Sequence, residues 1–381
     1  MDHQGAVSKG IALTDRQRVA WLRLIRTDNV GPVTFRDLIN HFGSAELALE
    51  ALPELASRGG ALKSVRIHPA DLAEREIEQA RRMGARFLGV GEPGYPLALR
   101  QIDGAPPLIS VKGRLDTLTQ PAIGIVGARN CSISGAKFAA SLAHAFGAHG
   151  YMIVSGLARG IDAAAHRAAM TTGTVAIYAG GLDQPYPPEN IGLSDEIVEN
   201  GGAIVSEMPF GWEPRARDFP RRNRLISGIA MGLVVVEAAL RSGSLITARM
   251  AADFGRQVFA APGSPLDPRC EGSNNLIKEG AALVTHAEDV LSALAPVSQL
   301  DLFHTPLVSE PERMDRDPLA SPPTDADRAA IVEALGPTPV EIDDIIRHTS
   351  LSAQQVYLVL LELDLAGRLH RHGSGLVSID L

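Results

Sequence analysis

The sequence predicts an α/β protein with a Rossmann-like, doubly wound and mostly parallel sheet, preceded by a helical domain and followed by a winged helix. Three observations support this prediction. Between residues 121 and 294, short apolar runs alternate with helical segments, which is the pattern of βαβ units. Before this region apolar residues recur at helical spacing. After it, three helical segments lead into two short β pieces.

The N-terminal region, residues 10–83, is expected to form a helical domain of the SAM or helix-hairpin-helix kind. Its apolar residues recur at helical spacing, as in Val19, Leu22 and Ile25. Residues 30–43 resemble one helix-hairpin-helix unit, in which a Gly turn opens an amphipathic helix whose N-terminal amides could face a phosphate. The pattern favours a hairpin that only packs over one that contacts DNA.

Residues 84–120 are rich in Pro and Gly and are expected to form a connecting extension before a core domain at residues 121–294. The core holds seven candidate strands, most of them joined by helices, so we expect a sheet covered on both faces. The candidates are residues 122–126, 152–155, 175–178, 203–206, 233–236, 258–260 and 282–284.

The C-terminal part is predicted to be a linker and a winged helix. Residues 295–324 hold six prolines and little periodicity, which is typical of a linker. Residues 325–381 contain three helical segments, with Ser352 as the N-cap of the third, and then two β pieces around residues 373–375. This module has nine acidic and four basic residues, a poor charge for gripping DNA.

The charge distribution points to one place where a polyanion would bind. The net charge of −8 argues against attraction of the whole molecule to nucleic acid. Residues 215–224, however, hold five arginines and a single acid, Asp218. Guanidinium groups hold phosphates bidentately, so we expect an anion at this cluster. With aromatics at only 4%, stacking on bases would depend on few residues.

The sequence also indicates a cytoplasmic protein without a membrane partner. No apolar run approaches the ~20 residues of a membrane-spanning helix. The first ten residues lack the apolar segment of a signal peptide. The two cysteines, Cys131 and Cys270, are too few for a framework of disulfides.

In a doubly wound sheet, ligands bind beyond the carboxyl ends of the strands. The first loop there is rich in glycine and carries Arg129, but it departs from the GxGxxG fingerprint of dinucleotide sites, so no cofactor is expected. We interpret Gly127 and Arg129 as parts of an anion-binding loop, in which Ser132 or Ser134 supplies hydroxyls and an N-cap.

The second loop begins with Ser155 and Gly156 and leads into a helix that carries Asp162 and His166 four residues apart. This pair could form an acid/base dyad, but a structural pair is favoured because no nucleophile or third metal ligand lies nearby in the sequence. No metal and no catalytic residue are expected. In the third loop, Tyr186 either shapes a rigid turn or makes a stacking or dimer contact.

The fourth loop carries the main candidates for binding, which are Phe219, Arg221, Arg222, Asn223 and Arg224. Arginines at the start of a helix oppose its macrodipole, which indicates that an anion binds there. An aromatic ring beside them could stack on a base.

The fifth loop places Glu237 at a strand end and Ser242 before a helix. The amides of Gly243 and Ser244 would hold a second phosphate or orient the first loop. Glu237 acts either as a general base or as a structural support that holds a neighbouring loop in place.

Six ordered motifs of the core domain resemble the DNA processing protein A (DprA, Smf) family. They are residues 125–129 (IVGAR), 155–166 (SGLARGIDAAAH), 181–187 (GLDQPYP), 219–228 (FPRRNRLISG), Glu237 with residues 242–247 (SGSLIT), and residues 261–263 (APG). The helical and winged modules fit the family's common extensions.

The resemblance implies a bacterial protein that binds single-stranded DNA, dimerises through its Rossmann-like domain and loads a RecA-type recombinase during natural transformation. It implies no enzymatic activity. By position, Arg129 and the cluster from Phe219 to Arg224 would hold the DNA backbone. Ser155, Gly156, Ser242 and Gly243 would line the pocket. The acidic winged helix is a departure that leaves its role open.

Three functions compete at this point. The leading one is a single-stranded DNA binder that acts in DNA uptake (competence) and recombination by protecting incoming DNA. The alternative is a nucleotide or nucleoside-phosphate hydrolase of the lysine-decarboxylase-like Rossmann type, with Glu237 as its catalytic carboxylate. Five clustered arginines exceed what one small phosphate needs, which favours the binder. A transcription regulator is disfavoured because the winged module is acidic.

Overall fold

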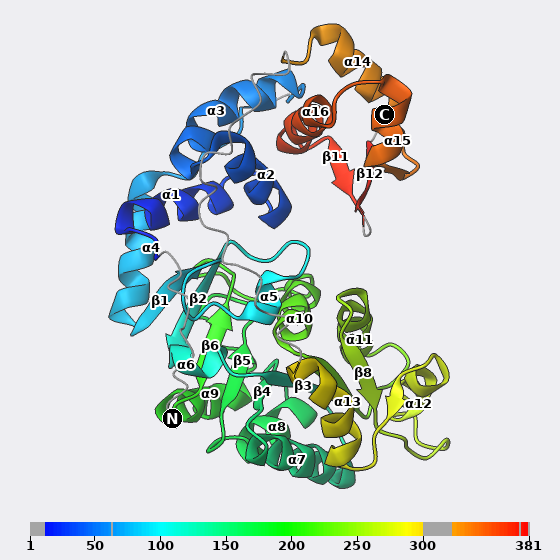
Figure 1. Ribbon diagram of the computed structural model, residues 1–381. Coiled ribbons are helices and arrows are strands. Elements are labelled where there is room, and N and C mark those ends of the chain that lie inside the picture. Colours follow the sequence, from blue (N-terminus) through cyan, green and yellow to red (C-terminus); the bar gives the residue numbers. More distant parts are fainter. Residues whose placement is uncertain (1–11, 62–63, 300–321, 373–374, 380–381) are drawn as a thin grey trace, which may run out of the picture. The chain divides into compact units, whose positions relative to one another are not determined.

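The computed structural model describes residues 12–61, 64–299, 322–372 and 375–379 of the chain (Figure 1). The chain divides into two compact units. Among the described residues, unit 1 comprises residues 12 and 75–299, and unit 2 comprises residues 13–61, 64–74, 322–372 and 375–379. Most of the linker predicted at residues 295–324 lies outside the described residues.

Unit 1 is built on a nine-stranded sheet in the order β1-β2-β6-β5-β4-β3-β7-β8-β9. The strands are β1 (Ala85–Gly89), β2 (Leu108–Gly113), β3 (Ala122–Gly127), β4 (Met152–Ser155), β5 (Thr174–Ile177), β6 (Ala203–Ser206), β7 (Gly232–Val236), β8 (Gln257–Ala260) and β9 (Ala282–Leu283). Strands β3 to β9 pair in parallel, whereas β1 and β2 pair antiparallel at one edge. The predicted doubly wound, mostly parallel sheet is confirmed.

All seven predicted strands are present, and two more are added by β1 and β2. These two strands lie among the Pro and Gly residues of segment 84–120, where the apolar runs are too short to show a period. Their place is decided by pairing: β2 lies against β6, where the Ser110 hydroxyl donates to the carbonyl of Ser206 at 3.0 Å. The sheet therefore extends into a segment that the sequence pattern leaves without structure.

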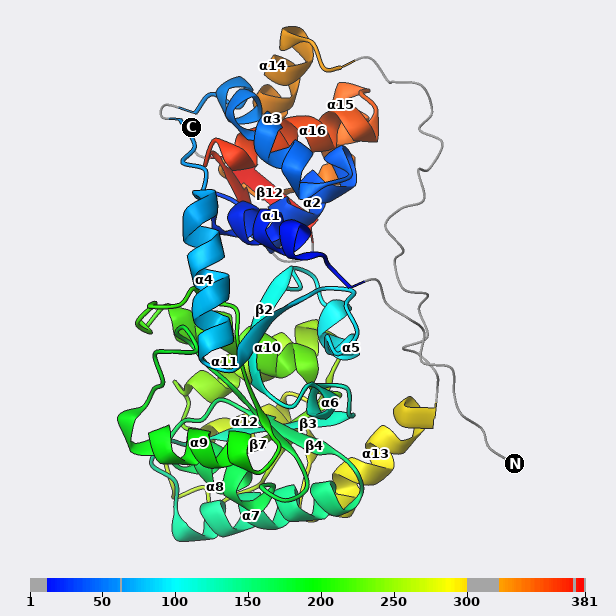
Figure 2. The ribbon, with the colours of Figure 1, turned by 90° about the vertical axis from the view of Figure 1, so that its left-hand side faces the viewer.

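Helices cover both faces of this sheet (Figures 1 and 2). One face is covered by α7 (Ile133–Ala148), α8 (Ile161–Ala168) and α13 (Ala287–Gln299), around a core that includes Phe146 and Phe259. The other face is covered by α5 (Leu97–Arg100), α10 (Asp218–Ile229) and α11 (Gly243–Asp253), around Leu99 and Leu225. The remaining helices between residues 70 and 299 are α4 (Ala70–Arg82), α6 (Leu115–Leu118), η1 (Pro188–Asn190), α9 (Ile191–Glu199) and α12 (Glu271–Lys278).

The strand order determines where loops gather. From the central strand β3, the chain proceeds through β4, β5 and β6 to one side and then through β7, β8 and β9 to the other. The topological switch point therefore lies between β3 and β7, and ligands of doubly wound sheets bind beside such points at the carboxyl ends of the strands.

Unit 2 contains an N-terminal helical module and a winged helix. Helices α1 (Asp15–Arg26), α2 (Pro32–Phe42) and α3 (Ala45–Arg58) enclose a core that includes Leu24, Phe35, Leu38 and Leu52. The winged helix consists of α14 (Asp325–Ala334), α15 (Ile342–Thr349), α16 (Ala353–Leu365) and a sheet of β10 (Val340–Glu341), β12 (Leu376–Ile379) and β11 (Leu369–Arg371).

Both predicted flanking modules are thus confirmed, and their helix starts follow the sequence. The predicted N-cap Ser352 accepts a hydrogen bond from the Gln355 amide and, with the Gln355 side chain, forms a capping box. Thr14 caps α1 in the same way, with Gln17. None of the described helices is long and apolar enough to cross a membrane.

Candidate nucleic-acid interface

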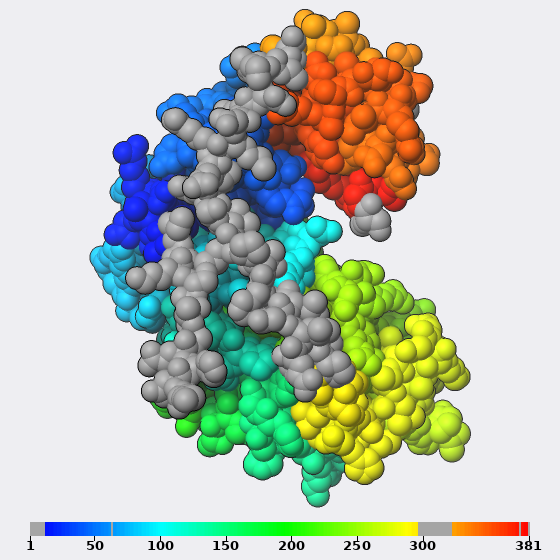
Figure 3. Space-filling view, viewed as in Figure 1, coloured from blue at the N-terminus to red at the C-terminus, as the bar shows by residue number. Residues whose placement is uncertain are grey.

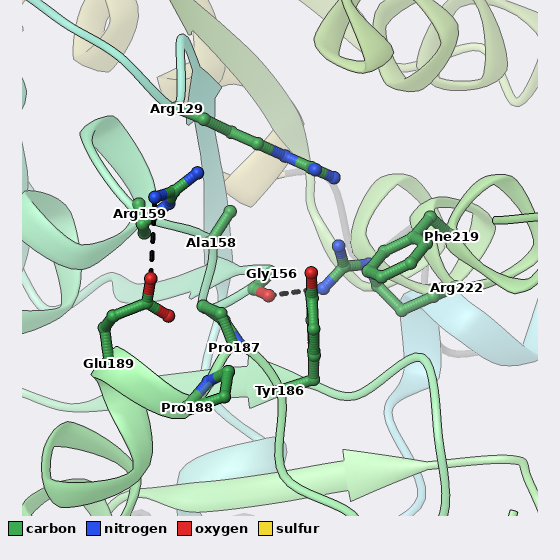
Figure 4. Close-up of a pocket in the computed structure, with 10 residues that line it drawn as sticks. All are labelled: Arg129, Gly156, Ala158, Arg159, Tyr186, Pro187, Pro188, Glu189, Phe219 and Arg222. Atoms are coloured by element: carbon green, nitrogen blue, oxygen red, sulfur yellow. Dashed lines mark hydrogen bonds and ion pairs between the residues drawn. The ribbon is translucent and has the colours of Figure 1, made fainter. Parts of the chain in front are cut away.

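A pocket of about 260 Å³ lies at the carboxyl ends of β3, β4 and β5 in unit 1 (Figure 4). Four segments supply its walls. The lining residues are Arg129 after β3, Gly156, Ala158 and Arg159 after β4, Tyr186, Pro187, Pro188 and Glu189 after β5, and Phe219 and Arg222 of α10. Three guanidinium groups and two aromatic rings therefore share one cavity.

Arg129 is the most available of these cations. Its side chain extends from the β3–α7 loop across the pocket, and its guanidinium carbon lies 5.3 Å from the centre of the Phe219 ring (Figure 4). Within the described residues Arg129 pairs with no carboxylate, whereas Arg159 lies 3.5 Å from Glu189. The charge of Arg129 is therefore free to meet an anion.

Phe219 and Tyr186 form the aromatic part of the pocket. Their rings meet edge to face, with centroids 5.6 Å apart and planes at 63°. Phe219 also packs against Arg222, whose guanidinium carbon is 5.7 Å from the ring centre. The sequence left Tyr186 open between a loop-shaping and a stacking role, and the fold places its half-exposed ring beside Phe219.

Arg222 is buried and braces the loops that form the pocket. Its Nη1 donates to the carbonyls of Gly156 and, at 2.8 Å, Ile177, and its Nε donates to the Asn223 side chain at 3.0 Å. Burial lowers the pKa of Arg222 to about 10, against the opposing effect of Asp162, so the group stays cationic at neutral pH. Arg222 therefore adds positive charge to the pocket while it holds the β4 and β5 loops together.

Arg221 and Arg224 share one carboxylate that the sequence analysis did not identify as their partner. The buried Glu207, just after β6, accepts from Arg221 Nε at 2.7 Å and from Arg224 Nη2 at 2.6 Å. Arg224 also donates to the Gly104 carbonyl. Asp218, at the start of α10, offsets the arginines further. Carboxylates of this chain therefore offset the unfavourable interaction between these arginines and the helix macrodipole. Less of the positive charge of the cluster is available to a bound anion than the sequence indicates.

The other predicted site residues support loops and do not line the pocket. Ser155 donates to the Ile125 carbonyl at 2.6 Å, and a Cβ on Gly127 would overlap the Val236 carbonyl. Asn223 donates to the Gly243 carbonyl at 3.3 Å, and Ser242 caps α11. Sequence reasoning missed Ala158, Arg159, Pro187, Pro188 and Glu189, although Arg159 stands inside the SGLAR motif and could have been found there.

Glu237 occupies the switch point between β3 and β7. Its carboxylate accepts the Ser132 amide at 2.8 Å and the Ser132 hydroxyl, at the N-terminus of α7. Its backbone adopts the left-handed region with φ of 53°, which is uncommon for a residue other than glycine. The N-terminus of α7, where the sequence predicted an anion, is thus occupied by the Glu237 carboxylate. Of the two roles left open for Glu237, a catalytic base or a structural support, the geometry matches the structural support.

Asp162 and His166 do not pair. Asp162 accepts the amides of Gly156 and Ala158 at 3.1 and 3.2 Å, while His166 Nδ1 lies 2.7 Å from the Thr174 hydroxyl. Burial lowers the pKa of His166 to about 3 and raises that of Asp162. No acid/base dyad forms, and no group of three metal-ligating side chains was found among the described residues.

The sheet and the pocket beyond its strand ends define a Rossmann-like α/β protein whose pocket is lined by arginines and aromatic rings. The chain belongs to the DNA recombination-mediator protein A family, also called DprA or Smf. The sequence profile of this family matches residues 86–295. A DprA-like N-terminal HHH domain matches residues 15–79, and a DprA winged helix domain matches residues 315–375. The resemblance seen in the six motifs is confirmed.

The relatives match between about half and nearly all of the chain. Protein Smf of Synechocystis is 31% identical over 93% of this chain and 97% of its own length. DprA of Streptococcus pneumoniae is 46% identical over 52% of this chain and 70% of its own length. The crystal structure of S. pneumoniae DprA aligns with a TM-score of 0.60 at 32% identity, covering 74% of this chain and 98% of that one. The structure of Helicobacter pylori DprA, described for its single-stranded DNA binding mode, aligns with a TM-score of 0.51 at 26% identity. The alignment covers 56% of this chain and 96% of that one.

Proposed function

We propose that this protein binds single-stranded DNA at the pocket between Arg129, Tyr186 and Phe219. The observation that carries the proposal is the placement of a guanidinium, which no carboxylate of the described residues pairs with, beside two aromatic rings. A cation holds a backbone phosphate, and a ring stacks on any base, so together they bind a single strand without reading its sequence. The description of the H. pylori relative supports the same ligand.

The pocket is small for a ligand site. Its volume of about 260 Å³ is below the ~300–1,000 Å³ typical of small-molecule sites. We infer that it holds one unit of a strand, whose neighbours lie on the surrounding surface. Exposed Arg215 and Arg217, just before α10, would extend the contact with the backbone.

The proposed contacts therefore differ in part from those inferred by position. Arg129, Gly156, Phe219 and the half-exposed Arg221 remain candidate contacts, and Arg159 and Tyr186 are added. Loop support is the proposed role of the rest, which are Gly127, Ser155, Arg222, Asn223, Arg224, Ser242 and Gly243.

Family membership supports the wider role. We propose that the protein is cytoplasmic, dimerises through its Rossmann-like domain, protects incoming DNA and loads a RecA-type recombinase on it during natural transformation. The family's description as a recombination mediator supports this reading. The hydrolase alternative would need the Glu237 carboxylate free to act, but that group is engaged by Ser132 and does not line the pocket.

The test of this function is a titration of the full chain with single- and double-stranded oligonucleotides, with nucleotide turnover assayed on the same samples. Tighter binding of the single strand at every salt concentration, without turnover, is expected. Equal affinity for both forms, or turnover, would refute the proposal.

Removing the ring of Phe219 should weaken single-strand binding without changing its salt dependence. Phe219→Leu keeps an apolar side chain but loses the stacking surface, which is worth about 1–3 kcal/mol per base. Phe219→Tyr keeps the ring and should bind like the wild type. Affinities of both variants measured over a salt series check this. A Leu variant with wild-type affinity would show that no base stacks there.

Glu237→Gln should preserve single-strand affinity and lower stability. The neutral amide keeps one acceptor for Ser132 but loses the charge at the N-terminus of α7, so the free energy of unfolding should fall by about 1–2 kcal/mol. Denaturant unfolding measures this loss, with Glu213→Gln, at an exposed position, as the matched control. Nucleotide turnover in the wild type that disappears in the Gln variant would instead promote the hydrolase.

A further inference from the structure

The winged helix lies against the N-terminal helical module within unit 2, and its third helix α16 makes the contact (Figures 1 and 3). In helix-turn-helix proteins that read DNA, the recognition helix enters the major groove. Here α16 contains no Lys or Arg, and its charged residues are Glu362 and Asp364. Its composition is therefore unsuited to contact with phosphates.

Two apolar stripes bury α16 on opposite sides. Val356, Val359, Leu360 and Leu363 belong to the core of the winged helix. By contrast, Leu361 and Leu365 belong to the core of α1, α2 and α3, with exposed fractions of 2% and 0%. Along the helix only Ala353, Gln354 and Tyr357 are exposed, so little of its surface is left for DNA.

Polar contacts bind the end of α16 to the hairpin that opens α2. The Thr34 hydroxyl, in the first turn of α2, donates to Asp364 Oδ2 at 2.9 Å, and the Asn29 amide group donates to the Leu365 carbonyl at 2.9 Å. Arg371 donates to Asp364 at 2.9 Å and to Asp37 at 3.1 Å. The Asp364 carboxylate thus lies at the start of α2, at the place where a phosphate would approach that helix.

The backbones of the two modules also come close together. A Cβ added to Gly59, at the end of α3, would overlap the carbonyl oxygen of Glu362 in α16. Glycine at this position permits a contact that any side chain would prevent.

We propose that α16 is an intramolecular docking surface, and that its partner is the α1–α3 module of this chain rather than DNA. While the contact holds, the α2 hairpin is covered as well, so neither element reads duplex DNA. The acidity of the winged helix, which suits DNA poorly, suits this role. The inference does not depend on the proposed binding of single strands in unit 1.

Thiol labelling of the full chain, resolved by site with mass spectrometry, tests the contact. Leu361→Cys places a thiol in the buried interface, and Tyr357→Cys places one on the exposed side of the same helix. We expect Leu361→Cys to react at least about 100-fold more slowly, which corresponds to an opening free energy of about 2.7 kcal/mol. Adding Gly59→Ala should remove this protection, whereas Gly336→Ala, where a Cβ meets open space, should not.

Four results would overturn the proposal. Equal reactivity of the two thiols, or protection that survives Gly59→Ala, would mean that the contact does not form as inferred. Protection that is lost on dilution would place the contact between two copies of the chain. The fourth is a loss of duplex affinity in Gln354→Glu or Tyr357→Glu, two variants that we expect to bind within about twofold of the wild type. Such a loss would restore α16 as a DNA-reading helix.

Discussion

Replacing Arg129 with Ala is expected to weaken the binding of single-stranded DNA by about 10- to 150-fold. A charge-assisted contact with a phosphate is worth about 1.5–3 kcal/mol, and Arg129 is the pocket arginine whose charge no carboxylate of the described residues takes up. Because its side chain is exposed and holds no loop together, the stability of the protein should not change.

The salt dependence makes this prediction specific. Loss of one phosphate contact should lower the slope of log K against log salt by about 0.7. Arg249→Ala removes an exposed arginine of α11 outside the pocket and serves as the control for net charge. Affinities of both variants for single-stranded DNA, measured over a salt series, test whether the slope falls only in Arg129→Ala. An Arg129→Ala variant with the wild-type affinity and slope would move the DNA site away from this pocket.

Replacing Arg222 with Ala is expected to lower the free energy of unfolding by about 3–5 kcal/mol, as for other buried charges that lose one partner. The change leaves the carbonyls of Gly156 and Ile177 without their donor and leaves the buried Asp162 without the nearby cation that opposes its desolvation. A loss of DNA binding in this variant would then follow from disorder of the β4 and β5 loops rather than from a lost phosphate contact.

The neighbouring arginine is the matched control for this effect. Arg221→Ala also removes one guanidinium, but its side chain is 47% exposed and Glu207 keeps Arg224 as a partner. The loss of stability should therefore be no more than about 1 kcal/mol. Denaturant unfolding of both variants measures the difference. Equal, small losses for the two variants would show that Arg222 does not brace these loops.

The pairing of Glu207 changes how the arginine cluster contributes to binding. Counted from the sequence, residues 215–224 present a concentrated positive charge. In the fold, one buried carboxylate holds Arg221 and Arg224. Arg221 and Arg224 therefore help to hold α10 against the sheet, and in the pocket the positive charge that no carboxylate of the described residues pairs with comes from Arg129, which lies in a different loop.

Local patterns in the sequence were enough to predict the architecture. Alternating apolar runs and helices identified the parallel strands, because strand and helix periods are written into neighbouring residues. Ser352 identified the start of α16 for the same reason, since a cap and its partner lie three residues apart. Six ordered motifs identified the family, and the structure brings Arg129, Gly156 and Phe219, which come from three separate loops, into one pocket.

Only the tertiary structure decided which charges are free and which surfaces are covered. Glu207 pairs with arginines 14 and 17 residues away, Glu237 accepts from Ser132 across 105 residues, and Thr34 donates to Asp364 across 330. No local period encodes such pairs, because they depend on which strand ends are neighbours and on which helix faces remain to be buried once each module has folded. The acidic composition of α16 does not by itself show that the helix is covered on two sides. Its docking follows from the second apolar stripe, which is shielded from water only when a partner covers it.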